Sequence, residues 1–440
     1  MRSARGILFL TTATLVAIVT LAIYRSVRAA TLIVPDGYPT IQAAIDAAGP
    51  GDTILVRPGT YFENVTLDKP VVLTAESFDV NDPTRNTTLI DGGSSGLVDT
   101  LTIPPGVSPM PTVRGFVIRN GRDGIVSRSE FVAEYNYFSQ SLDQIDYSHT
   151  GGGINRHNVY FNAGDDALDL DNTKRSLLIE GNRMMYSLDD GIEIRLQSTS
   201  APAQPITITI RNNEFVGSGE DGIQFIDYIG LPEDTNRRFV ISGNLIANSV
   251  KAGIGLMPNA ISNEDYSGAD TVEAIRVYNN TLYGNDYGIS GGDNLVAFNN
   301  LIAHSTTRGV WKVQGRFGAN SVVAYTLFYN NGTQTEQSTL GAGNLFGQDP
   351  FFAAPPNPGP DGVWRTVDDD FSGMALQAGS PAIDAGVTQY IARDRKAIPP
   401  TAISGFTGPA PDLGWQEFMT PATATTGPSP TPRPIRPRRR

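Results

Sequence analysis

The chain has 440 residues, with 33 Lys and Arg against 45 Asp and Glu, three histidines and no cysteine. The lack of cysteine excludes disulfide scaffolds, thiolate zinc sites and thiol catalysis, and the 46 glycines and 30 prolines favour a turn-rich β protein. Nine arginines lie in two terminal segments without acids, residues 1–29 and 420–440, so the body between them has 24 basic and 45 acidic residues, a net charge of −21. Such a body repels nucleic acid, and an acidic ligand would require a bridging cation.

Residues 1–29 are predicted to be a targeting segment. Arg2 and Arg5 precede the apolar run ILFLTTATLVAIVTLAIY, and Val27 to Ala29 offers small residues for cleavage by signal peptidase. The run of 18 residues is also just long enough to span a membrane, so a signal peptide and an uncleaved signal anchor are both open. In either case we expect the body to be secreted or in the cell envelope, with membrane contact only through this segment.

A short helix is predicted near the start of the body. Thr40 can cap the amphipathic stretch IQAAIDAA, and Gly49 would end it. We expect this helix to cover the open end of an elongated core.

Two sequence ladders then recur in step along the chain, which indicates a repeat structure with one coil per repeat and loops of variable length. The first ladder is apolar and consists of Ile125, Ile145, Leu168, Ile192, Ile223, Ile254, Ile289 and Val310. The second consists of Asn136, Asn158, Asn182, Asn213, Asn244, Asn280 and Asn300. Short alternating strands such as ITITIRN lie between them, so stacked coils should form parallel sheets in which the asparagines satisfy buried turn backbone.

This pattern, together with the opening VPDGYPTIQAAIDAAGPGDTILVRPGTYFENVTL, resembles the right-handed parallel β-helix of the pectate-lyase superfamily. The resemblance implies an all-β fold, a single-stranded right-handed parallel β-helix (solenoid), over residues 31–350, with the short N-terminal capping helix. Residues 351–419, which include SPAIDAG and APDLGWQEF, look like a C-terminal closing module packed on the last coils. The Pro/Thr/Arg-rich residues 420–440 are predicted to be a disordered tail.

Acidic residues gather in the central coils, above all in AGDDALDLDN, residues 163–172. The position two residues before each apolar ladder residue is acidic in five successive coils: Asp123, Asp143, Asp166, Asp190 and Asp221. Matching positions on neighbouring coils lie about 4.8 Å apart, so these acids form a stripe. Turn capping explains Asp123 and Asp221, which precede glycine. It explains Asp169 and Glu193 less well, because both should project outward from a strand.

A cluster of hard oxygen ligands without His or Cys is typical of calcium. The pattern resembles the calcium site of polysaccharide lyase family 9, in which an Asp on one coil joins an Asp-Asp-x-x-Asp set on the next. The resemblance implies calcium as cofactor, with Asp143, Asp165, Asp166 and Asp169 as metal ligands.

The catalytic base of that family is a lysine just after the apolar ladder position, where this sequence has Glu193 and Gln224. Arg195, on the same outward face as Glu193, is predicted to be the base that takes the proton α to a uronate carboxylate. Lys174, Arg175 and Glu193 are predicted to bind substrate. The alternative for the three basic residues is that they are surface counter-charges to the stripe.

We therefore expect a secreted or surface β-helix protein, a monomer, that acts on an acidic polysaccharide by calcium-dependent β-elimination of a uronate polymer. One alternative is a non-catalytic carbohydrate-binding or cell-surface β-helix protein. Another is a polygalacturonase-like glycoside hydrolase, for which Asp165 and Asp166 supply paired acids but the Gly-His-Gly and Arg-x-Lys motifs are missing. Copper delivery of the NosD-like kind is disfavoured by the lack of cysteine and the scattered histidines.

Overall fold

The computed structural model describes residues 29–93, 96–197, 201–227, 235–258, 266, 271, 273–292, 294–314, 321–366, 368–391 and 402–419. The predicted targeting segment, apart from Ala29, and the predicted tail lie outside these residues. Within the described part of the chain, no helix is long and apolar enough to cross a membrane.

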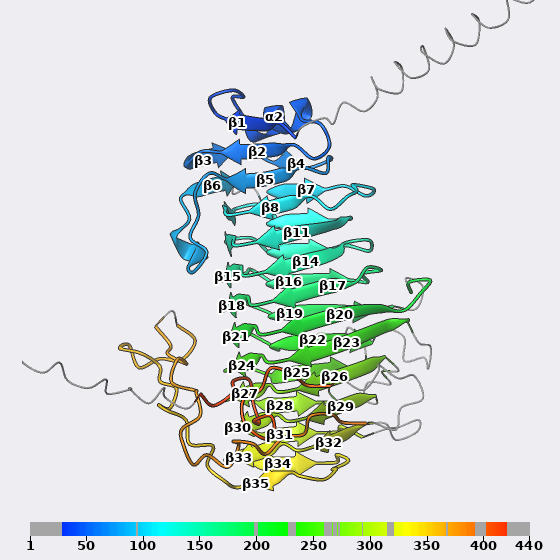
Figure 1. Ribbon diagram of the computed structural model, residues 1–440, viewed down its shortest axis with the longest axis vertical. Coiled ribbons are helices and arrows are strands. Elements are labelled where there is room, and N and C mark those ends of the chain that lie inside the picture. Colours follow the sequence, from blue (N-terminus) through cyan, green and yellow to red (C-terminus); the bar gives the residue numbers. More distant parts are fainter. Residues whose placement is uncertain are drawn as a thin grey trace, which may run out of the picture.

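The chain winds through three parallel sheets, which we call A, B and C, and Figure 1 shows the coils stacked along the long axis of the molecule. Sheet A has 12 strands: β1 (Thr31–Val34), β2 (Thr53–Val56), β5 (Val72–Ala75), β8 (Thr112–Arg114), β11 (Glu130–Glu134), β14 (Gly152–Arg156), β17 (Leu177–Glu180), β20 (Ile206–Arg211), β23 (Arg237–Ser242), β26 (Ala274–Tyr278), β29 (Leu295–Phe298) and β32 (Val322–Ala324).

Sheets B and C are built in the same way from the remaining strands. Sheet B has 12 strands: β3 (Gly59–Phe62), β6 (Thr88–Asp91), β9 (Val117–Arg119), β12 (Tyr137–Ser139), β15 (Val159–Phe161), β18 (Arg183–Met185), β21 (Glu214–Val216), β24 (Leu245–Ala247), β27 (Thr281–Tyr283), β30 (Leu301–Ala303), β33 (Leu327–Tyr329) and β35 (Leu345–Phe346). Sheet C has 11 strands: β4 (Val65–Thr66), β7 (Leu101–Ile103), β10 (Ile125–Ser127), β13 (Ile145–Tyr147), β16 (Leu168–Asp171), β19 (Ile192–Leu196), β22 (Ile223–Asp227), β25 (Ala252–Met257), β28 (Tyr287–Ser290), β31 (Arg308–Trp311) and β34 (Thr333–Glu336).

This arrangement fits a right-handed parallel β-helix, so the predicted all-β fold is confirmed. Each strand of a sheet pairs with strands one coil away, and one turn of the chain separates neighbours in the same sheet. The described residues contain little helix: α2 (Ile41–Ala47) and the 3₁₀ turn η1 (Pro83–Arg85). Thr40 caps α2 by accepting a hydrogen bond from the backbone N–H of Ala43.

The apolar ladder read from the sequence is a column of paired residues in sheet C. Its members pair from coil to coil in this order: Ile125, Ile145, Leu168, Ile192, Ile223, Ile254, Ile289 and Val310. All eight side chains are fully buried and belong to the main core. The predicted register of the coils is therefore confirmed, and it fixes which acidic residues are neighbours.

The asparagine ladder lies at the turns that enter sheet B, and its predicted structural role is confirmed. Asn213 shows the repeated pattern. Its Oδ1 accepts hydrogen bonds from the backbone N–H (2.9 Å) and Nδ2 (3.0 Å) of Asn182, and its Nδ2 donates to the carbonyl oxygen of Ile179 (3.1 Å) and to Oδ1 of Asn244 (3.0 Å). The seven asparagines are at most 1% exposed, so these bonds satisfy backbone groups that water does not reach.

The described residues of the segment predicted as a closing module, 351–366, 368–391 and 402–419, lie along sheet B in the lower half of the molecule (Figure 1). Leu376, Ala382 and Leu413 pack with Leu301 and Leu327 in an apolar cluster separate from the main core. A further cluster joins Phe371 and Met374 to side chains of β21 and β24. The backbone N–H of Trp415 also donates to Oγ1 of Thr281 on β27 (3.2 Å).

Candidate functional site

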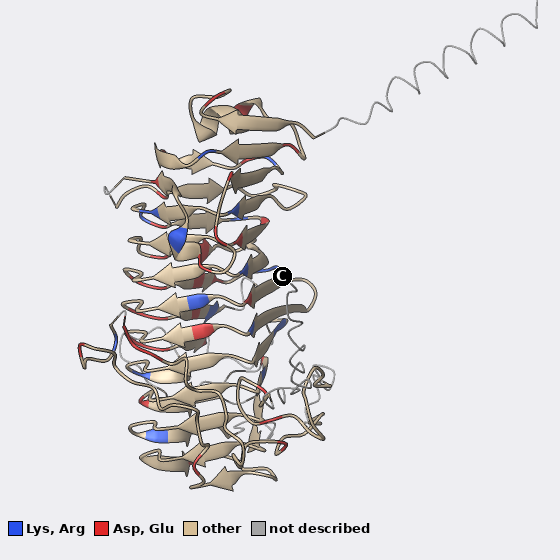
Figure 2. Cartoon of the chain, turned by 60° about the vertical axis from the view of Figure 1, so that its left-hand side comes forward, with Lys and Arg blue, Asp and Glu red and all other residues tan. Residues whose placement is uncertain are grey.

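Sheet C carries two columns of acidic residues on its central coils, and Figure 2 shows acidic residues recurring on successive coils. One column immediately precedes the strands and contains Asp123, Asp143, Asp166, Asp190 and Asp221. The other lies on the outward face of the strands, where Asp146 of β13 pairs in register with Asp169 of β16 and Asp169 pairs with Glu193 of β19. Both columns place like charges on adjacent coils, which is electrostatically unfavourable when the groups are ionised.

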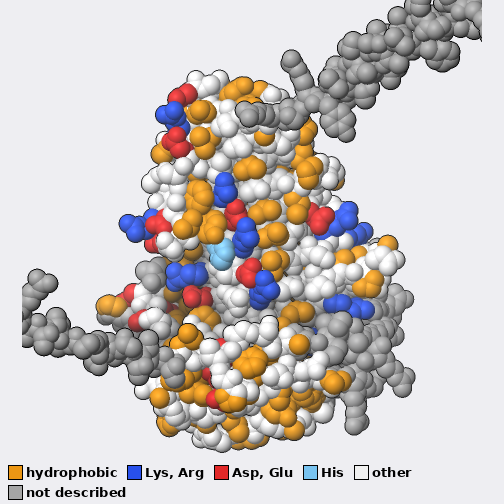
Figure 3. Space-filling view, viewed as in Figure 1, with side chains coloured by type: hydrophobic (Ala, Val, Ile, Leu, Met, Phe, Trp, Pro, Cys, Tyr) orange, Lys and Arg blue, Asp and Glu red, His pale blue; other side chains and the backbone are white. Residues whose placement is uncertain are grey.

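The outward face of sheet A carries a stacked column of charged residues that pair with one another. There the stacked residues alternate in sign: Arg114, Glu134, Arg156, Glu180 and Arg211 lie in register on β8, β11, β14, β17 and β20. Ion pairs join Glu134 to Arg114 (3.5 Å) and Arg156 (2.6 Å), and Glu180 to Arg211 (2.7 Å). Figure 3 shows basic and acidic side chains alternating down this face. The acidic columns of sheet C lack such alternation.

The column that precedes the strands is a hydrogen-bonded aspartate ladder. The backbone N–H of Asp166 donates to Oδ1 of Asp143 (3.2 Å), that of Asp190 to Oδ1 of Asp166 (2.8 Å), and that of Asp221 to Oδ1 of Asp190 (2.7 Å). The ladder ends where the N–H of Ala252 donates to Oδ1 of Asp221 (2.6 Å). Each carboxyl group thus satisfies the backbone of the next coil, a structural role that differs from capping its own turn.

Burial changes the protonation of this ladder. Asp166 is 2% exposed and Asp190 and Asp221 are fully buried, so loss of hydration raises the pKa of all three. For Asp221, burial outweighs the hydrogen bonds from Tyr266 and Ala252 and raises the pKa to about 8. Burial and the charge of Asp123 raise the pKa of Asp143 to about 7. Burial therefore favours the protonated form of these carboxyl groups, most clearly of Asp221.

We expect Asp221→Asn to stabilise the protein increasingly as pH rises from 4 to 8. Below about pH 4 the carboxyl is neutral in both states, and between pH 4 and 8 the unfolded chain ionises while the native state does not, so wild-type stability falls. Each pKa unit corresponds to about 1.4 kcal/mol, and the unpaired amide N–H offsets part of this. The expected gain at pH 8 is about 2 to 3 kcal/mol. Urea unfolding at several pH values measures it, and a difference that is independent of pH would contradict it.

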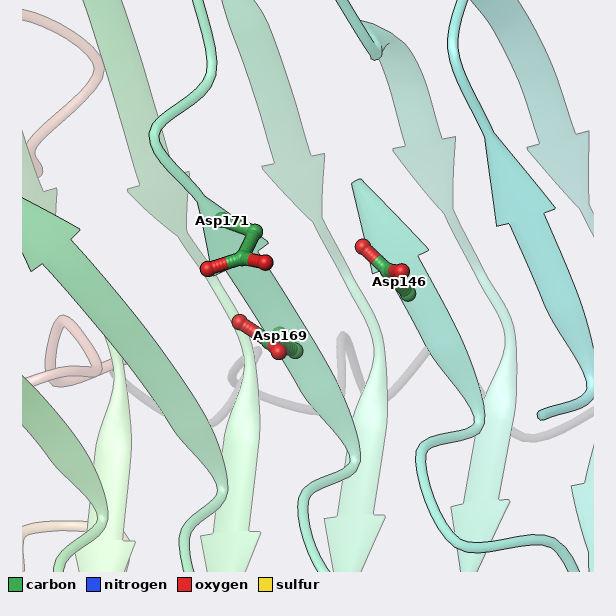
Figure 4. A group of neighbouring side chains, drawn as sticks. All are labelled: Asp146, Asp169 and Asp171. Atoms are coloured by element: carbon green, nitrogen blue, oxygen red, sulfur yellow. The ribbon is translucent and has the colours of Figure 1, made fainter. Parts of the chain in front are cut away.

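The outward column brings together a compact group of three carboxylates, Asp146, Asp169 and Asp171, shown in Figure 4. Asp169 and Asp171 come from β16 and Asp146 from the neighbouring β13, and one oxygen of each lies within 4.8 Å of the others. Asp169 is 6% exposed, and its Oδ1 is buried without a hydrogen-bond partner in the described part of the chain. Oδ1 is therefore a buried acceptor atom without a donor among the described residues.

The raised pKa values in this group follow from burial and crowding. Burial raises the pKa of Asp169 to about 8 against the opposing effect of Arg195, with Asp171, Asp143 and Asp146 adding to the rise. Burial likewise raises the pKa of Asp146 to about 6, although hydrogen bonds from Ser148 oppose it. A divalent cation would relieve this repulsion and complete the unpartnered Oδ1. Three carboxylates without His or Cys fit calcium better than a transition metal.

Arg195, the predicted base, lies beside this group on β19, in register with Asp171. Its Nη1 is 2.6 Å from Oδ2 of Asp169 and 3.2 Å from Oδ1 of Asp171, and its Nη2 pairs with Oε1 of Glu193. Partial burial lowers the pKa of Arg195, but the carboxylates, led by Asp169 and Glu193, outweigh burial and raise that pKa above its ordinary value. The guanidinium is therefore a cation shared among three acids.

The four predicted metal ligands do not form one group. Asp169 lies with Asp146 and Asp171, whereas Asp165 and Asp166 lie in a second group with Asp189, in which one oxygen of each residue is within 4.8 Å of the others. Asp143 belongs to the aspartate ladder, where its Oδ1 accepts the N–H of Asp166. The prediction omitted Asp146 and Asp171. Asp146 could have been found from its position in the same column as Asp169. Asp171 could have been found because it lies two residues after Asp169, on the same face of the strand.

The predicted substrate-binding residues lie in two places. Glu193 is buried in the outward column, next to Asp169. Lys174 and Arg175 lie between β16 and β17, in the turn that leads from sheet C to sheet A. Lys174 is half-buried and Arg175 is exposed. Both basic residues therefore follow the strand that carries Asp169 and Asp171.

No family model matches the chain, and no curated protein matches its sequence. Solved structures with a similar fold include an alginate lyase from Paenibacillus sp. str. FPU-7 (14% identity over 72% of this chain and 98% of that chain, TM-score 0.44). They also include pectate lyase Pel9A (15% identity, 86% and 91%, TM-score 0.49) and the A-module of the mannuronan C-5 epimerase AlgE6 from Azotobacter vinelandii (17% identity, 70% and 89%, TM-score 0.47). The three parallel sheets fit the predicted right-handed parallel β-helix, and the likeness of the acidic cluster to the family 9 calcium site stays a prediction.

Proposed function

We propose that this protein binds an acidic polysaccharide on the outward face of sheet C through calcium held by Asp146, Asp169 and Asp171, and cleaves its uronate linkages by β-elimination. The observation that carries the proposal is the unpartnered Oδ1 of buried Asp169 inside a group of like charges. The sheet A column supports it by contrast, because there acidic and basic residues alternate coil by coil, whereas in sheet C the single guanidinium of Arg195 is shared by Asp169, Asp171 and Glu193.

Calcium at this group would bind a uronate carboxylate and make the neighbouring proton more acidic. Arg195 is the proposed base, because it lies against Asp169 and Asp171 at the edge of the group. The exposed Arg175 and half-buried Lys174 are proposed to hold further uronate carboxylates by charge-assisted hydrogen bonds, and Glu193 to orient Arg195. Two other residues predicted as metal ligands, Asp165 and Asp166, are proposed to act as ligands within the group that they form with Asp189.

Non-catalytic binding is the second candidate, and the state of Arg195 favours it. A guanidinium paired with three carboxylates is a hydrogen-bond donor only and cannot accept a proton. A base at this position has to lose its proton, which the raised pKa of Arg195 opposes. Calcium-dependent binding without cleavage would need no such change.

An assay on three polymers separates these functions. The purified protein is incubated with polygalacturonate, alginate or chondroitin, in calcium and then with chelator, and ultraviolet absorbance reports the unsaturated product. Calcium-dependent product from one polymer, lost in Asp169→Asn, supports the lyase. Calcium-dependent binding without product supports the binding protein, and new reducing ends without absorbance indicate a hydrolase.

Arg195→Ala is expected to bind calcium about tenfold more tightly than the wild type, while any β-elimination is lost. The reason is that Arg195 competes with the metal for Asp169 and Asp171. Removing its positive charge from beside these carboxylates should make the free energy of calcium binding more favourable by about 1.4 kcal/mol or more. Calorimetric titration measures the affinity. Arg183→Ala, which removes an ion pair with Glu214 on sheet B, is the matched control and should leave the affinity unchanged. Weaker calcium binding in Arg195→Ala would contradict this prediction.

A further inference from the structure

A cavity of about 460 Å³ lies between sheet B and the C-terminal segment. Its floor comes from three successive coils, through Met185 of β18, Val216 of β21 and Leu245 of β24. Phe371 and Trp415 of the C-terminal segment form the opposite wall. This volume is within the range of small-ligand sites. The cavity is built on sheet B, so it is separate from the acidic columns of sheet C.

The cavity combines apolar surface with polar atoms that lack partners. Asp369 and Trp415 both line it, and Oδ1 of Asp369 and Nε1 of Trp415 are shielded from water without a hydrogen-bond partner among the described residues. Such atoms are costly in a folded protein, because they have lost their hydration without replacement. One is an acceptor and the other a donor. A ligand hydroxyl group both donates and accepts, so it can pair with either type of atom.

The charges around the cavity select against an anionic ligand. Its described lining includes three carboxylates, Glu214, Asp369 and Asp370, but one guanidinium, Arg183. Arg183 is already paired with Glu214, with Nε 3.0 Å from Oε2. A uronate would meet uncompensated negative charge here, unlike at a site that holds a cation.

We propose that this cavity binds an uncharged pyranose residue of a glycan. The apolar face of the ring would lie against the indole of Trp415 and the ring of Phe371, and its hydroxyl groups would pair with Asp369 and with the Arg183–Glu214 pair at the rim. This site does not depend on the function proposed for sheet C. It would let the protein hold a neutral side chain or neighbouring glycan while sheet C engages an acidic polymer.

Calorimetric titration with neutral tetrasaccharides tests the proposal, with cellotetraose, mannotetraose and galactotetraose as probes and tetragalacturonate as the charged comparison. All titrations are done with chelator present, so that a metal-dependent site on sheet C does not contribute. We expect saturable binding of at least one neutral probe, weakened about tenfold by Asp369→Ala and about fivefold by Trp415→Phe, each through loss of one hydrogen bond.

Trp364→Phe is the matched control, because Trp364 touches Phe371 but does not line the cavity, and it should bind as the wild type does. Unchanged melting temperatures of the variants would show that the fold is intact. Absence of binding for all three neutral probes would overturn the proposal. Binding that neither Asp369→Ala nor Trp415→Phe alters, or tighter binding of tetragalacturonate that Trp415→Phe removes, would also overturn it.

Discussion

Asp169→Asn is expected to weaken calcium binding about a hundredfold, to the point where chelator no longer changes the melting temperature. Asp169 is the buried centre of the carboxylate group and holds the unpartnered Oδ1. The substitution keeps the shape of the side chain but removes one negative charge from a cation that prefers charged oxygen ligands. A hundredfold change corresponds to about 2.7 kcal/mol. Calorimetry measures the affinity, and the calcium-induced rise in melting temperature follows from the affinity by mass action.

The pH dependence of calcium binding, measured by the same calorimetric titration, gives an independent test. Calcium must displace protons from Asp146 and Asp169, whose pKa values are raised to about 6 and about 8. Wild-type affinity should therefore increase between pH 6 and 8, and Asp169→Asn should lose most of that increase. Asp36→Asn, an exposed acid paired with Arg57 near the N-terminal end, is the control. Equal calcium affinity in Asp169→Asn and Asp36→Asn would show that the metal does not bind at this group.

Asn213→Ala is expected to reduce the free energy of unfolding by about 4 kcal/mol or more. The change removes four hydrogen bonds of the asparagine ladder and leaves the backbone N–H of Asn182 and the carbonyl of Ile179 unsatisfied in the core. Each buried polar group left without a partner costs about 1 to 3 kcal/mol, and the lost side-chain volume adds to this.

Thr207→Ala, an exposed substitution on the neighbouring strand β20, is the matched control, with an expected change within about 0.5 kcal/mol. Urea unfolding of the two variants gives the comparison. Similar stability of Asn213→Ala and Thr207→Ala would mean that the ladder contributes little, and that coil stacking depends on the apolar column alone.

The fold was predictable because residues of the same type recur at equivalent positions of successive coils. Matching positions on adjacent coils are occupied by Ile125 and Ile145, and by Asn213 and Asn244. Because the strands pair in parallel, residues at matching positions are in contact. The same rule placed Asp146 beside Asp169. Differences in length between the ladders do not disturb this, because the paired strands keep the same register from coil to coil.

The candidate site was less predictable, because side-chain direction decides which carboxylates meet. Asp143 and Asp166 stack along the backbone and accept its N–H groups, whereas Asp169 and Asp171 project from the strand toward Asp146. Sequence spacing assigns both sets to the same stripe. The ion pairs of Arg195 depend on side-chain conformation in the same way. The cavity on sheet B could not be predicted at all, since it joins Trp415 to residues such as Met185 that are far away in the sequence.

Binding of a defined uronate oligomer in the presence and absence of calcium tests the central claim most directly. Tetragalacturonate, tetramannuronate and a chondroitin tetrasaccharide are titrated into the wild type and Asp169→Asn, first with calcium and then with chelator. If the acidic group of sheet C holds calcium for an acidic polysaccharide, at least one oligomer binds saturably to the wild type with calcium, and binding is lost with chelator and in Asp169→Asn. Equal binding with calcium and with chelator, or no binding by any of the three, would contradict the account.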